Sequence, residues 1–269
     1  MGSPLFDQHV HTQFSWDASR GDMEASCRRA ESIGLRAIAF TEHADFVSGV
    51  HEEMHRLDVD AYLIEVERCR TLFPSLRIVS GAELGEPHRF PAEVQALLRG
   101  ARLERILGSV HCLTWSGRLI DASQLGRLPA AEAGEFMRAY LREVAALARS
   151  DQPFQVLSHI DYPKRYWPVE AVRFDEDDYE GEYREVLSAL AQRGGVLELN
   201  TSRGMPPERG WCPGPKVVGW WRELGGDAVS FGSDAHAPDM IAKGFAAASA
   251  MAEGLGFKPS ADLSEYWRR

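Results

Sequence analysis

Cysteine is scarce in this sequence, and no two cysteines have the spacing of a metal or redox motif. The four lie at positions 27, 69, 112 and 212, too far apart along the chain for a zinc knuckle or a Cys-x-x-Cys pair. Isolated cysteines of this kind are typical of reduced, mostly buried thiols in a cytoplasmic protein. We therefore expect four free thiols and a cytoplasmic location.

Long apolar runs and excess positive charge are lacking as well. No stretch approaches the roughly 20 apolar residues of a transmembrane helix, and the first residues lack the basic segment and apolar run of a signal peptide. The formal net charge is -10, whereas sequence-independent binding of nucleic acid needs a basic surface. We expect neither a membrane nor a long nucleic acid as partner, and the sequence carries no signal of oligomeric state.

Short β-rich apolar runs alternate with helical patterns along the whole chain. Runs that are apolar on both faces and separated by helices predict a parallel sheet covered by helices. The absence of a Ser/Gly-rich linker favours one α/β barrel over two domains, so we expect a single domain over residues 1–269. The predicted strands are 5–10, 35–43, 77–84, 105–111, 154–161, 195–202 and 228–236, and the clearest helices are 22–34, 58–73, 128–150 and 179–195.

Histidine and acidic residues end or directly follow six of these seven strands. Residues i and i+2 of a strand point to the same side, so His9 and His11 can direct two imidazoles at one point. In a barrel of parallel strands, all the carboxyl ends open on one face, where active sites are built. We therefore expect a metal site formed by residues distant in sequence, namely His9, His11, Asp17, His43, Glu83, His111, His159, Asp234 and His236.

These candidate ligands are too many for one ion, because a tetrahedral site takes about four. Two or three divalent ions sharing a carboxylate would use them all, and Glu83 is the candidate bridge, since its two oxygens can bind different ions. Mixed His and carboxylate sites accept Zn, Mn and Fe. Such a centre attracts an anionic substrate and ionises a bound water, so we expect a metal-bridging hydroxide to attack phosphorus in a phosphate ester.

Several polar side chains lie close to the predicted centre in sequence. Arg203 follows the sixth strand, which has no candidate ligand, while Lys164 and Arg165 follow the fifth strand. A guanidinium group binds phosphate through two parallel hydrogen bonds, so these are candidate substrate-binding residues, with Arg203 also catalytic. Asp161 is a candidate general acid or hydrogen-bond partner for a metal-ligating histidine. His88 is a further candidate substrate contact, although a surface position is an alternative for it and for the basic residues.

Seven ordered motifs carry a resemblance to a known family. They are HVHTQFSWD (9–17), FTEHADF (40–46), GAELGE (81–86), LGSVHCL (107–113), LSHIDYPKRY (157–166), ELNTSRG (198–204) and GSDAH (232–236). Together they resemble the polymerase-and-histidinol-phosphatase (PHP) family, and within it the monofunctional histidinol-phosphate phosphatases. The resemblance implies a distorted, TIM-like (β/α)7 barrel with up to three metals at the C-terminal ends of the strands.

The resemblance also implies a reaction and three ligand sets. The reaction is metal-dependent hydrolysis of the phosphomonoester L-histidinol phosphate to L-histidinol and phosphate, late in histidine biosynthesis. Many family members have His where this chain has Asp17, and the segment LGEPHRF (84–90) differs from the usual continuation, which leaves the choice of substrate open. The implied sets are His9, His11, Glu83 and Asp234 for the first metal, Glu83, His111 and His159 for the second, and Asp17, His43 and His236 for the third.

Four alternatives remain open on the sequence. The segment HEEMH (51–55) matches the H-E-x-x-H motif of zinc proteases, but Asp58 is a better helix start than any residue before it. A PHP-type phosphatase, phosphodiesterase or nuclease acting on nucleotides or another small phosphate ester fits the same ligands. An amidohydrolase also begins with His-x-His, but usually bridges its metals with a carboxylated lysine, where this chain offers His111. The last alternative is a non-catalytic metal-binding module.

Overall fold

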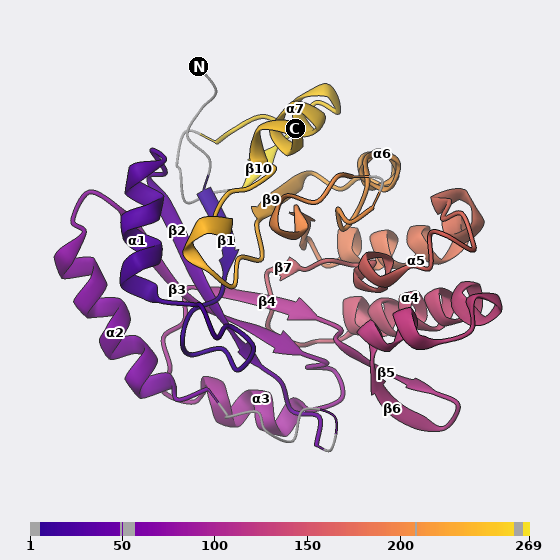
Figure 1. The fold of residues 1–269 in the computed structure, drawn as a ribbon, viewed down its shortest axis with the longest axis horizontal. Helices are drawn as coiled ribbons and strands as arrows, with labels where there is room; N and C mark the ends of the chain where they lie inside the picture. The colour runs from indigo at the N-terminus through magenta and orange to yellow at the C-terminus, as the bar shows by residue number, and fades with distance from the viewer. Residues whose placement is uncertain (1–5, 49, 51–56, 208, 261–265) are drawn as a thin grey trace.

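A curled sheet lies at the centre of the molecule (Figure 1). The computed structural model describes residues 6–48, 50, 57–207, 209–260 and 266–269, and within them the main sheet has eight strands. The first seven in the sheet order pair in parallel and the last is antiparallel to its neighbour. In order they are β1 (Phe6–Val10), β2 (Ala37–Ala44), β3 (Arg77–Gly85), β4 (Arg105–Ser109), β7 (Val156–Leu157), β8 (Val196–Asn200), β9 (Ala228–Gly232) and β10 (Trp267–Arg268).

Each of the seven predicted runs overlaps one of the parallel strands, and β2 and β3 extend one residue beyond their runs. All eight residues of β2 are buried, and so are eight of the nine in β3, because helices and the sheet interior cover both faces. The sheet curls far enough for its first strand to meet the segment after β9. There the His11 amide donates to the Ala235 carbonyl at 2.9 Å, and the Asp234 amide donates to the His9 carbonyl at 2.9 Å. This seam brings residues from the two ends of the chain together.

Helices lie around the outside of the curled sheet (Figure 1). The four predicted ones are present as α1 (Met23–Ser32), α2 (Val59–Leu72), α4 (Ala133–Arg149) and α5 (Glu180–Gln192). The carboxylates of Asp22 and Asp58 accept hydrogen bonds from the amides of Ala25 and Ala61, so each acid caps a helix at the position where the sequence predicts its start. The α2 helix is also anchored by Tyr62, whose hydroxyl donates to the Phe40 carbonyl at 2.7 Å.

The structure adds elements that the sequence analysis did not predict. They are the antiparallel strand β10, the helices α3 (Pro91–Leu98), α6 (Pro215–Glu223) and α7 (Phe245–Gly254), and a hairpin of β5 (Cys112–Trp115) and β6 (Arg118–Asp121). Six short 3₁₀ helices occur among the described residues: η1 (Ala122–Arg127), η2 (Ala130–Glu132), η3 (Tyr162–Tyr166), η4 (Glu176–Tyr179), η5 (Ser202–Gly204) and η6 (Pro238–Met240). Two of them, η3 and η5, follow β7 and β8 and carry the basic residues predicted there.

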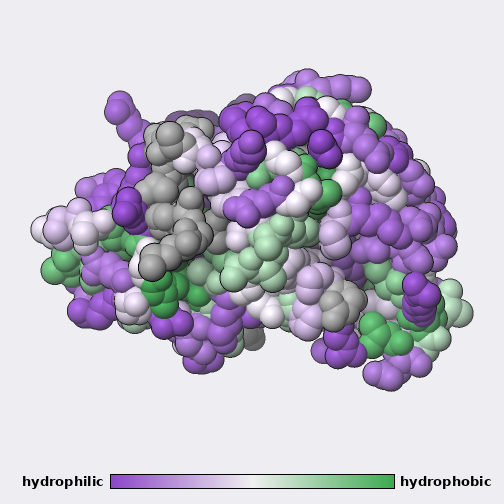
Figure 2. All heavy atoms as spheres, turned by 90° about the horizontal axis from the view of Figure 1, so that it is seen from above, coloured by the Kyte–Doolittle hydropathy of each residue, from purple (hydrophilic) through white to green (hydrophobic). Residues whose placement is uncertain are grey.

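The polar surface and the free, buried cysteines agree with the amino-acid composition. Hydrophilic residues predominate on the face drawn in Figure 2, and hydrophobic residues form small separate groups. All four cysteines are buried and free. In the part of the chain that the structure describes, no helix combines the length and the apolar character needed to cross a membrane. The protease-like segment 51–55 lies outside the described residues.

Candidate metal centre

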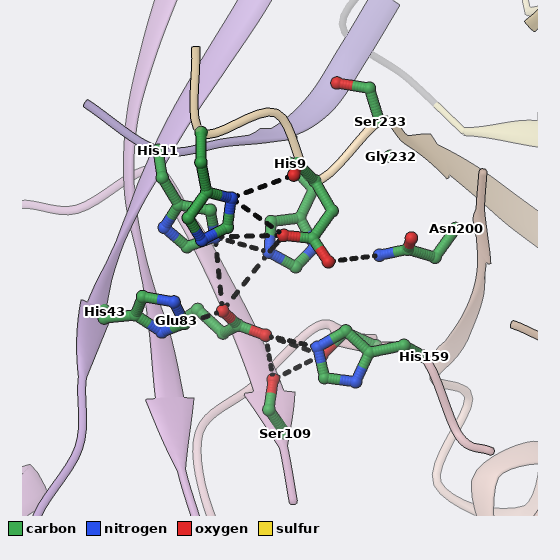
Figure 3. A network of polar contacts seen from close by, with 12 residues as sticks. His9, His11, His43, Glu83, Ser109, His159, Asn200, Gly232 and Ser233 are labelled. Atoms are coloured by element: carbon green, nitrogen blue, oxygen red, sulfur yellow. Dashed lines mark hydrogen bonds and ion pairs between the residues drawn. The ribbon is translucent and has the colours of Figure 1, made fainter. Parts of the chain in front are cut away.

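Five histidine rings surround the carboxylate of Glu83, a fully buried residue near the end of β3. Figure 3 labels His9, His11, His43 and His159 among them. Each ring directs a nitrogen at one of the two carboxylate oxygens, so the oxygens divide the rings into two groups. Glu83 is therefore placed as a bridge between neighbouring positions. Its Oε2 lies 3.2 Å from His9 Nε2, 3.4 Å from His11 Nε2 and 3.2 Å from His43 Nδ1, and its Oε1 lies 2.8 Å from His159 Nε2 and 3.3 Å from His111 Nε2.

Two more carboxylates and a sixth histidine extend the cluster. Asp234 Oδ1 lies 3.6 Å from His11 Nε2 and 3.5 Å from His236 Nδ1. Asp17 is shared between His43 and His236, at 3.4 Å and 2.8 Å. The structure thus brings together all nine residues that the sequence predicts as metal ligands.

The sheet register and the strand ends explain this convergence. His43 and Glu83 are direct partners on the parallel strands β2 and β3, so their side chains lie at the same level. His159 and Asp234 follow β7 and β9 with φ values of 22° and 56°. These left-handed conformations turn the chain sharply at the strand end, and such strain is typical of functional sites.

Four overlapping triads of ligand atoms are close enough to hold an ion. In each, the three atoms lie within 4.8 Å of one another. One triad falls within the first ligand set implied by the family resemblance, whereas the other three combine members of different implied sets. The triads are His9, His11 and Asp234; His9, Glu83 and His159; His43, Glu83 and His111; and His11, His43 and His236.

The hydrogen bonds behind His9 and His11 indicate that their inner nitrogens carry lone pairs. His9 Nδ1 lies 2.6 Å from Glu198 Oε1, and only a protonated Nδ1 can donate to that carboxylate. His11 Nδ1 lies 2.9 Å from the hydroxyl of Ser15, which itself donates to Glu42. With both rings neutral, the two Nε2 atoms carry lone pairs and face each other at 2.9 Å. Two opposed lone pairs need a cation, so the residues present fit a metal ion.

Buried polar atoms without a hydrogen bond support the same conclusion. Among the described residues, Glu83 Oε2, His43 Nδ1 and His236 Nε2 are buried and make no hydrogen bond of good geometry, although other atoms of the cluster lie close to them. Buried polar groups are otherwise nearly always satisfied. All three atoms belong to predicted ligands, and a divalent ion would satisfy them.

The acidic residues of the cluster are held in the ionised form. Burial alone raises the pKa of Glu83, Asp17 and Asp234, but neighbouring positive groups outweigh it and lower all three pKa values well below their usual range. For Asp234 the strongest of these groups is Arg165. Burial lowers the pKa of His11 and His159, which favours neutral rings with free lone pairs, whereas for His9, His43 and His111 the neighbouring carboxylates outweigh burial and raise the pKa when no metal is bound. Ionised carboxylates and neutral imidazoles are the forms that bind metals.

Two arginines border the cluster on the side of Asp234. Arg165 Nη2 lies 2.7 Å from Asp234 Oδ2, and this guanidinium also donates to Asn200 and Ser202. Arg203 donates from Nε to the Asp234 carbonyl at 3.0 Å, and its Nη2 lies 2.9 Å from His236 Nδ1. A hollow of about 180 Å³ adjoins Arg203, lined by Asp17, Ser19, Arg20, Arg203, His236, Ala237 and Met240.

Three other predicted site residues are engaged elsewhere. Lys164 is 3% exposed, and its ammonium group lies 3.1 Å from Asp161. The Asp161 carboxylate also accepts from the Tyr183 hydroxyl at 2.8 Å. No described residue hydrogen-bonds to the outer nitrogen of His159, so the expected contact from Asp161 to that ring is not formed. His88 lies 2.6 Å from Glu143 of α4. These placements favour structural roles over contact with substrate.

The sequence analysis missed two buried carboxylates behind the ligands. Glu198 of β8 contacts His9, and Asp45, two residues after His43, lies 2.7 Å from His111 Nδ1. Glycines make room for both: a Cβ atom on Gly232 would lie 2.1 Å from Glu198 Oε1, and one on Gly85 would lie 2.1 Å from Asp45 Oδ1. The sequence did contain a signal. Glu198 lies within a predicted buried strand and Asp45 closely follows His43, and a buried acid needs a polar partner.

Comparison with known proteins places this geometry in a family. The PHP domain model matches residues 7–202. A probable histidinol-phosphatase of Clostridium acetobutylicum is 30% identical over 95% of both chains, and a histidinol-phosphatase of Lactococcus lactis is 27% identical over 86% of this chain and 83% of its own. The crystal structure of histidinol phosphate phosphatase from Lactococcus lactis, complexed with Zn, L-histidinol and phosphate, covers 94% of both chains with a TM-score of 0.81 at 23% identity. A putative histidinol phosphatase from Listeria monocytogenes covers 90% of this chain and 99% of its own, with a TM-score of 0.75 at 20% identity. The chain belongs to the PHP domain family.

Proposed function

We propose that this protein is a metal-dependent phosphomonoesterase that hydrolyses L-histidinol phosphate to L-histidinol and phosphate. The observation that carries the proposal is the convergence of nine ligand residues around Glu83, with two guanidinium groups beside them. Relatives named histidinol-phosphatase, which match nearly the whole chain, support the choice of substrate.

The centre would hold two or three divalent ions. Glu83 would be shared between them, with the histidine rings and Asp234 completing their ligands, and Asp17, His43 and His236 forming the outer position. Zinc fits this donor set, and zinc is bound in the Lactococcus lactis structure; manganese and iron are the other candidates. When bound, the ions would activate a water for in-line attack on phosphorus and neutralise phosphoryl oxygens.

Arg203 and Arg165 would bind the phosphoryl group. His236 Nδ1 lies 3.0 Å from the Asp234 carbonyl as well as 2.9 Å from Arg203 Nη2. When Nδ1 carries its proton, it donates to that carbonyl, and the Arg203 guanidinium is then free to turn toward a phosphate in the adjoining hollow. Arg165 is fixed by Asn200 and would keep its charge at the edge of the centre.

Glu83 and Arg203 remain the proposed catalytic residues, whereas Asp161 needs a direct test. A catalytic Asp161 would protonate the leaving alkoxide, but its carboxylate is tied to Lys164 and Tyr183. If the role is structural, Asp161→Asn lowers thermal stability and leaves the pH profile of kcat unchanged. If it is the general acid, the alkaline limb of that profile changes instead.

We also propose the finer architecture and setting of the enzyme. The hydrogen bonds across the β1–β9 seam support a distorted (β/α)7 barrel formed by one domain. The free thiols support a cytoplasmic location. The net charge of -10 supports a small phosphorylated substrate over long nucleic acid.

The test compares phosphate release from L-histidinol phosphate, a nucleoside monophosphate and an aryl phosphate. Each assay uses protein loaded with Zn, Mn or Fe whose metal content has been counted. We expect kcat/KM to be highest for L-histidinol phosphate. Equal rates on all three, or a preference for the nucleotide, would keep the phosphoesterase and refute the histidinol assignment, and no release from any ester would refute both.

A further inference from the structure

The parallel strand β8 supplies none of the predicted metal ligands, yet its residue Glu198 contacts one of them. The geometry points to Glu198 of this strand as a positioning residue that fixes the proton of His9 on Nδ1 and thereby presents Nε2 to the metal. This inference rests on the metal centre proposed above. Through Glu198, β8 would take part in metal binding although it supplies no residue to the three implied ligand sets.

The carboxylate of Glu198 is buried and held by contacts to three residues. Its side chain is 1% exposed, and its two oxygens face different partners. Oε1 lies 2.6 Å from His9 Nδ1, while Oε2 accepts from the His159 amide at 2.9 Å and from Asn200 Nδ2 at 3.0 Å. One carboxylate therefore holds the ring of one predicted ligand and the backbone of another.

The backbone around Glu198 is shaped to admit the carboxylate. The neighbouring strand β9 has Gly232 beside the Glu198 carboxylate, where a Cβ atom would lie 2.1 Å from Oε1 and 2.7 Å from His9 Cβ. Glycine is thus needed for the ring and the carboxylate to meet. Figure 3 shows Gly232 beside His9, on the side of the centre where Asn200 lies.

The consequence for His9 follows from the number of ring protons. A neutral imidazole carries one proton, so a proton held at Nδ1 leaves Nε2 with the lone pair that a metal requires. Carboxylates placed behind metal-ligating histidines act in this way, and losing one typically lowers metal affinity about 10- to 100-fold. Glu198 therefore contributes to metal affinity without touching the metal.

The variant Glu198→Gln tests this with little change in shape. A glutamine amide has one oxygen, and two donors, the His159 amide and Asn200, face the Oε2 position, whereas one faces the Oε1 position. The amide oxygen will therefore occupy the Oε2 position and its NH2 group will face His9. Nδ1 must then accept a hydrogen bond, which moves the ring proton to Nε2 and blocks the metal.

The experiment measures zinc affinity by competition with a chromophoric chelator and records the ring protons of His9 by ¹H–¹⁵N NMR, assigned with His9→Asn. In the zinc-loaded wild type we expect a proton on His9 Nδ1. In Glu198→Gln we expect the affinity for at least one zinc ion to fall about 10- to 100-fold, and His9 to carry its proton on Nε2. The matched control is Glu104→Gln, which removes a carboxylate that contacts Ser80 at the opposite end of the sheet and should leave zinc binding unchanged.

Either of two results would overturn the inference. One is a folded Glu198→Gln protein with wild-type zinc affinity and a proton on His9 Nδ1. The other is a wild-type protein in which His9 carries no proton on Nδ1. This NMR result would overturn the inference even if the variant does not fold. Neither measurement uses phosphate release, so a wrong substrate assignment would leave both results intact.

Discussion

At the scale of single residues, Arg203 illustrates how the site combines strain with charge. It has a φ of 62°, and its neighbour Ser202 has a φ of 47°, so the turn after β8 is held in the left-handed region. Such a conformation costs free energy and persists where the surrounding contacts fix it. This turn places the Arg203 guanidinium against the backbone of Asp234 and the ring of His236.

We expect Arg203→Leu to lower kcat/KM for the phosphate ester by about 10²- to 10³-fold, the usual effect of removing one charge-stabilising donor. Arg203→Lys should retain part of the activity, because it keeps the charge but loses the two-pronged hydrogen bonds. The measurement is steady-state phosphate release with metal content counted for each variant. Arg173→Leu removes a guanidinium that is 88% exposed and serves as the control. An Arg203→Leu enzyme as active as this control would contradict the phosphate-binding role.

The site residues that could be predicted from the sequence differ physically from those that could not. Ligands such as His9 and His111 could be predicted because histidine is rare and each one marks a strand end. Glu198 and Asp45 could not be assigned, since a lone acid carries no sign of its partner until the strands are paired. Lys164 and Arg165 are neighbours in sequence, yet only the guanidinium of Arg165 reaches the metal cluster, because Lys164 pairs with Asp161.

At the scale of secondary-structure elements, an ion-pair cluster ties α4 to the segment after β3. Glu143 of α4 binds both His88 and Arg89, the latter through two nitrogens. Burial raises the pKa of Glu143, but the hydrogen bonds from His88 and Arg89 outweigh it and lower the pKa to about 2. The cluster therefore attaches the loop after β3 to helix α4, on the outside of the sheet.

The depressed pKa gives this cluster a defined pH dependence. Because the folded pKa lies below the ordinary value of 4.5, the carboxylate stabilises the fold above pH 4.5, and this contribution is lost as the pH falls toward 2. We expect Glu143→Gln to lower the free energy of unfolding by about 1–3 kcal/mol at pH 7. Urea unfolding of both proteins between pH 7 and pH 3 should show the difference shrinking below pH 4.5. A difference that stays constant with pH would contradict the assigned pKa.

The elements predicted from sequence are those with strong local patterns. All seven parallel strands and the four long helices are present, because buried β-rich runs and capped amphipathic segments are visible without tertiary context. The hairpin of β5 and β6 was missed because its strands have four residues each and no residue of β6 is buried. The strand β7 has two residues where eight were predicted, since His159 leaves extended geometry to enter the centre.

At the scale of the whole molecule, the metal centre should stabilise the fold that creates it. The predicted ligands come from six strands or the loops that follow them, so ions bound there would hold the curled sheet together. Free metal at 1,000 times its dissociation constant adds about 4 kcal/mol to the stability of a one-site protein. We expect a chelator to lower the Tm and added Zn²⁺ to restore it in a concentration-dependent way, as followed by circular dichroism.

The control for this effect is Glu83→Gln, which removes the bridging carboxylate. Its Tm should respond much less to Zn²⁺ than that of the wild type. If the chelator leaves the wild-type Tm unchanged while removing the counted metal, the ions do not stabilise the fold. The hydrogen-bonded β1–β9 seam would then hold the sheet by itself.

The seam between β1 and β9 also has a consequence for the protein during its synthesis. His9 and His11 are made well before Asp234 and His236, which lie more than 200 residues later in the sequence. A growing chain therefore contains these two histidines long before Asp234 and His236 exist, and the two triads that include a residue after β9 cannot form until then. The full set of nine ligands is assembled only when the last parallel strand has joined the first, so the finished fold, and not the nascent chain, presents the complete centre to the metal.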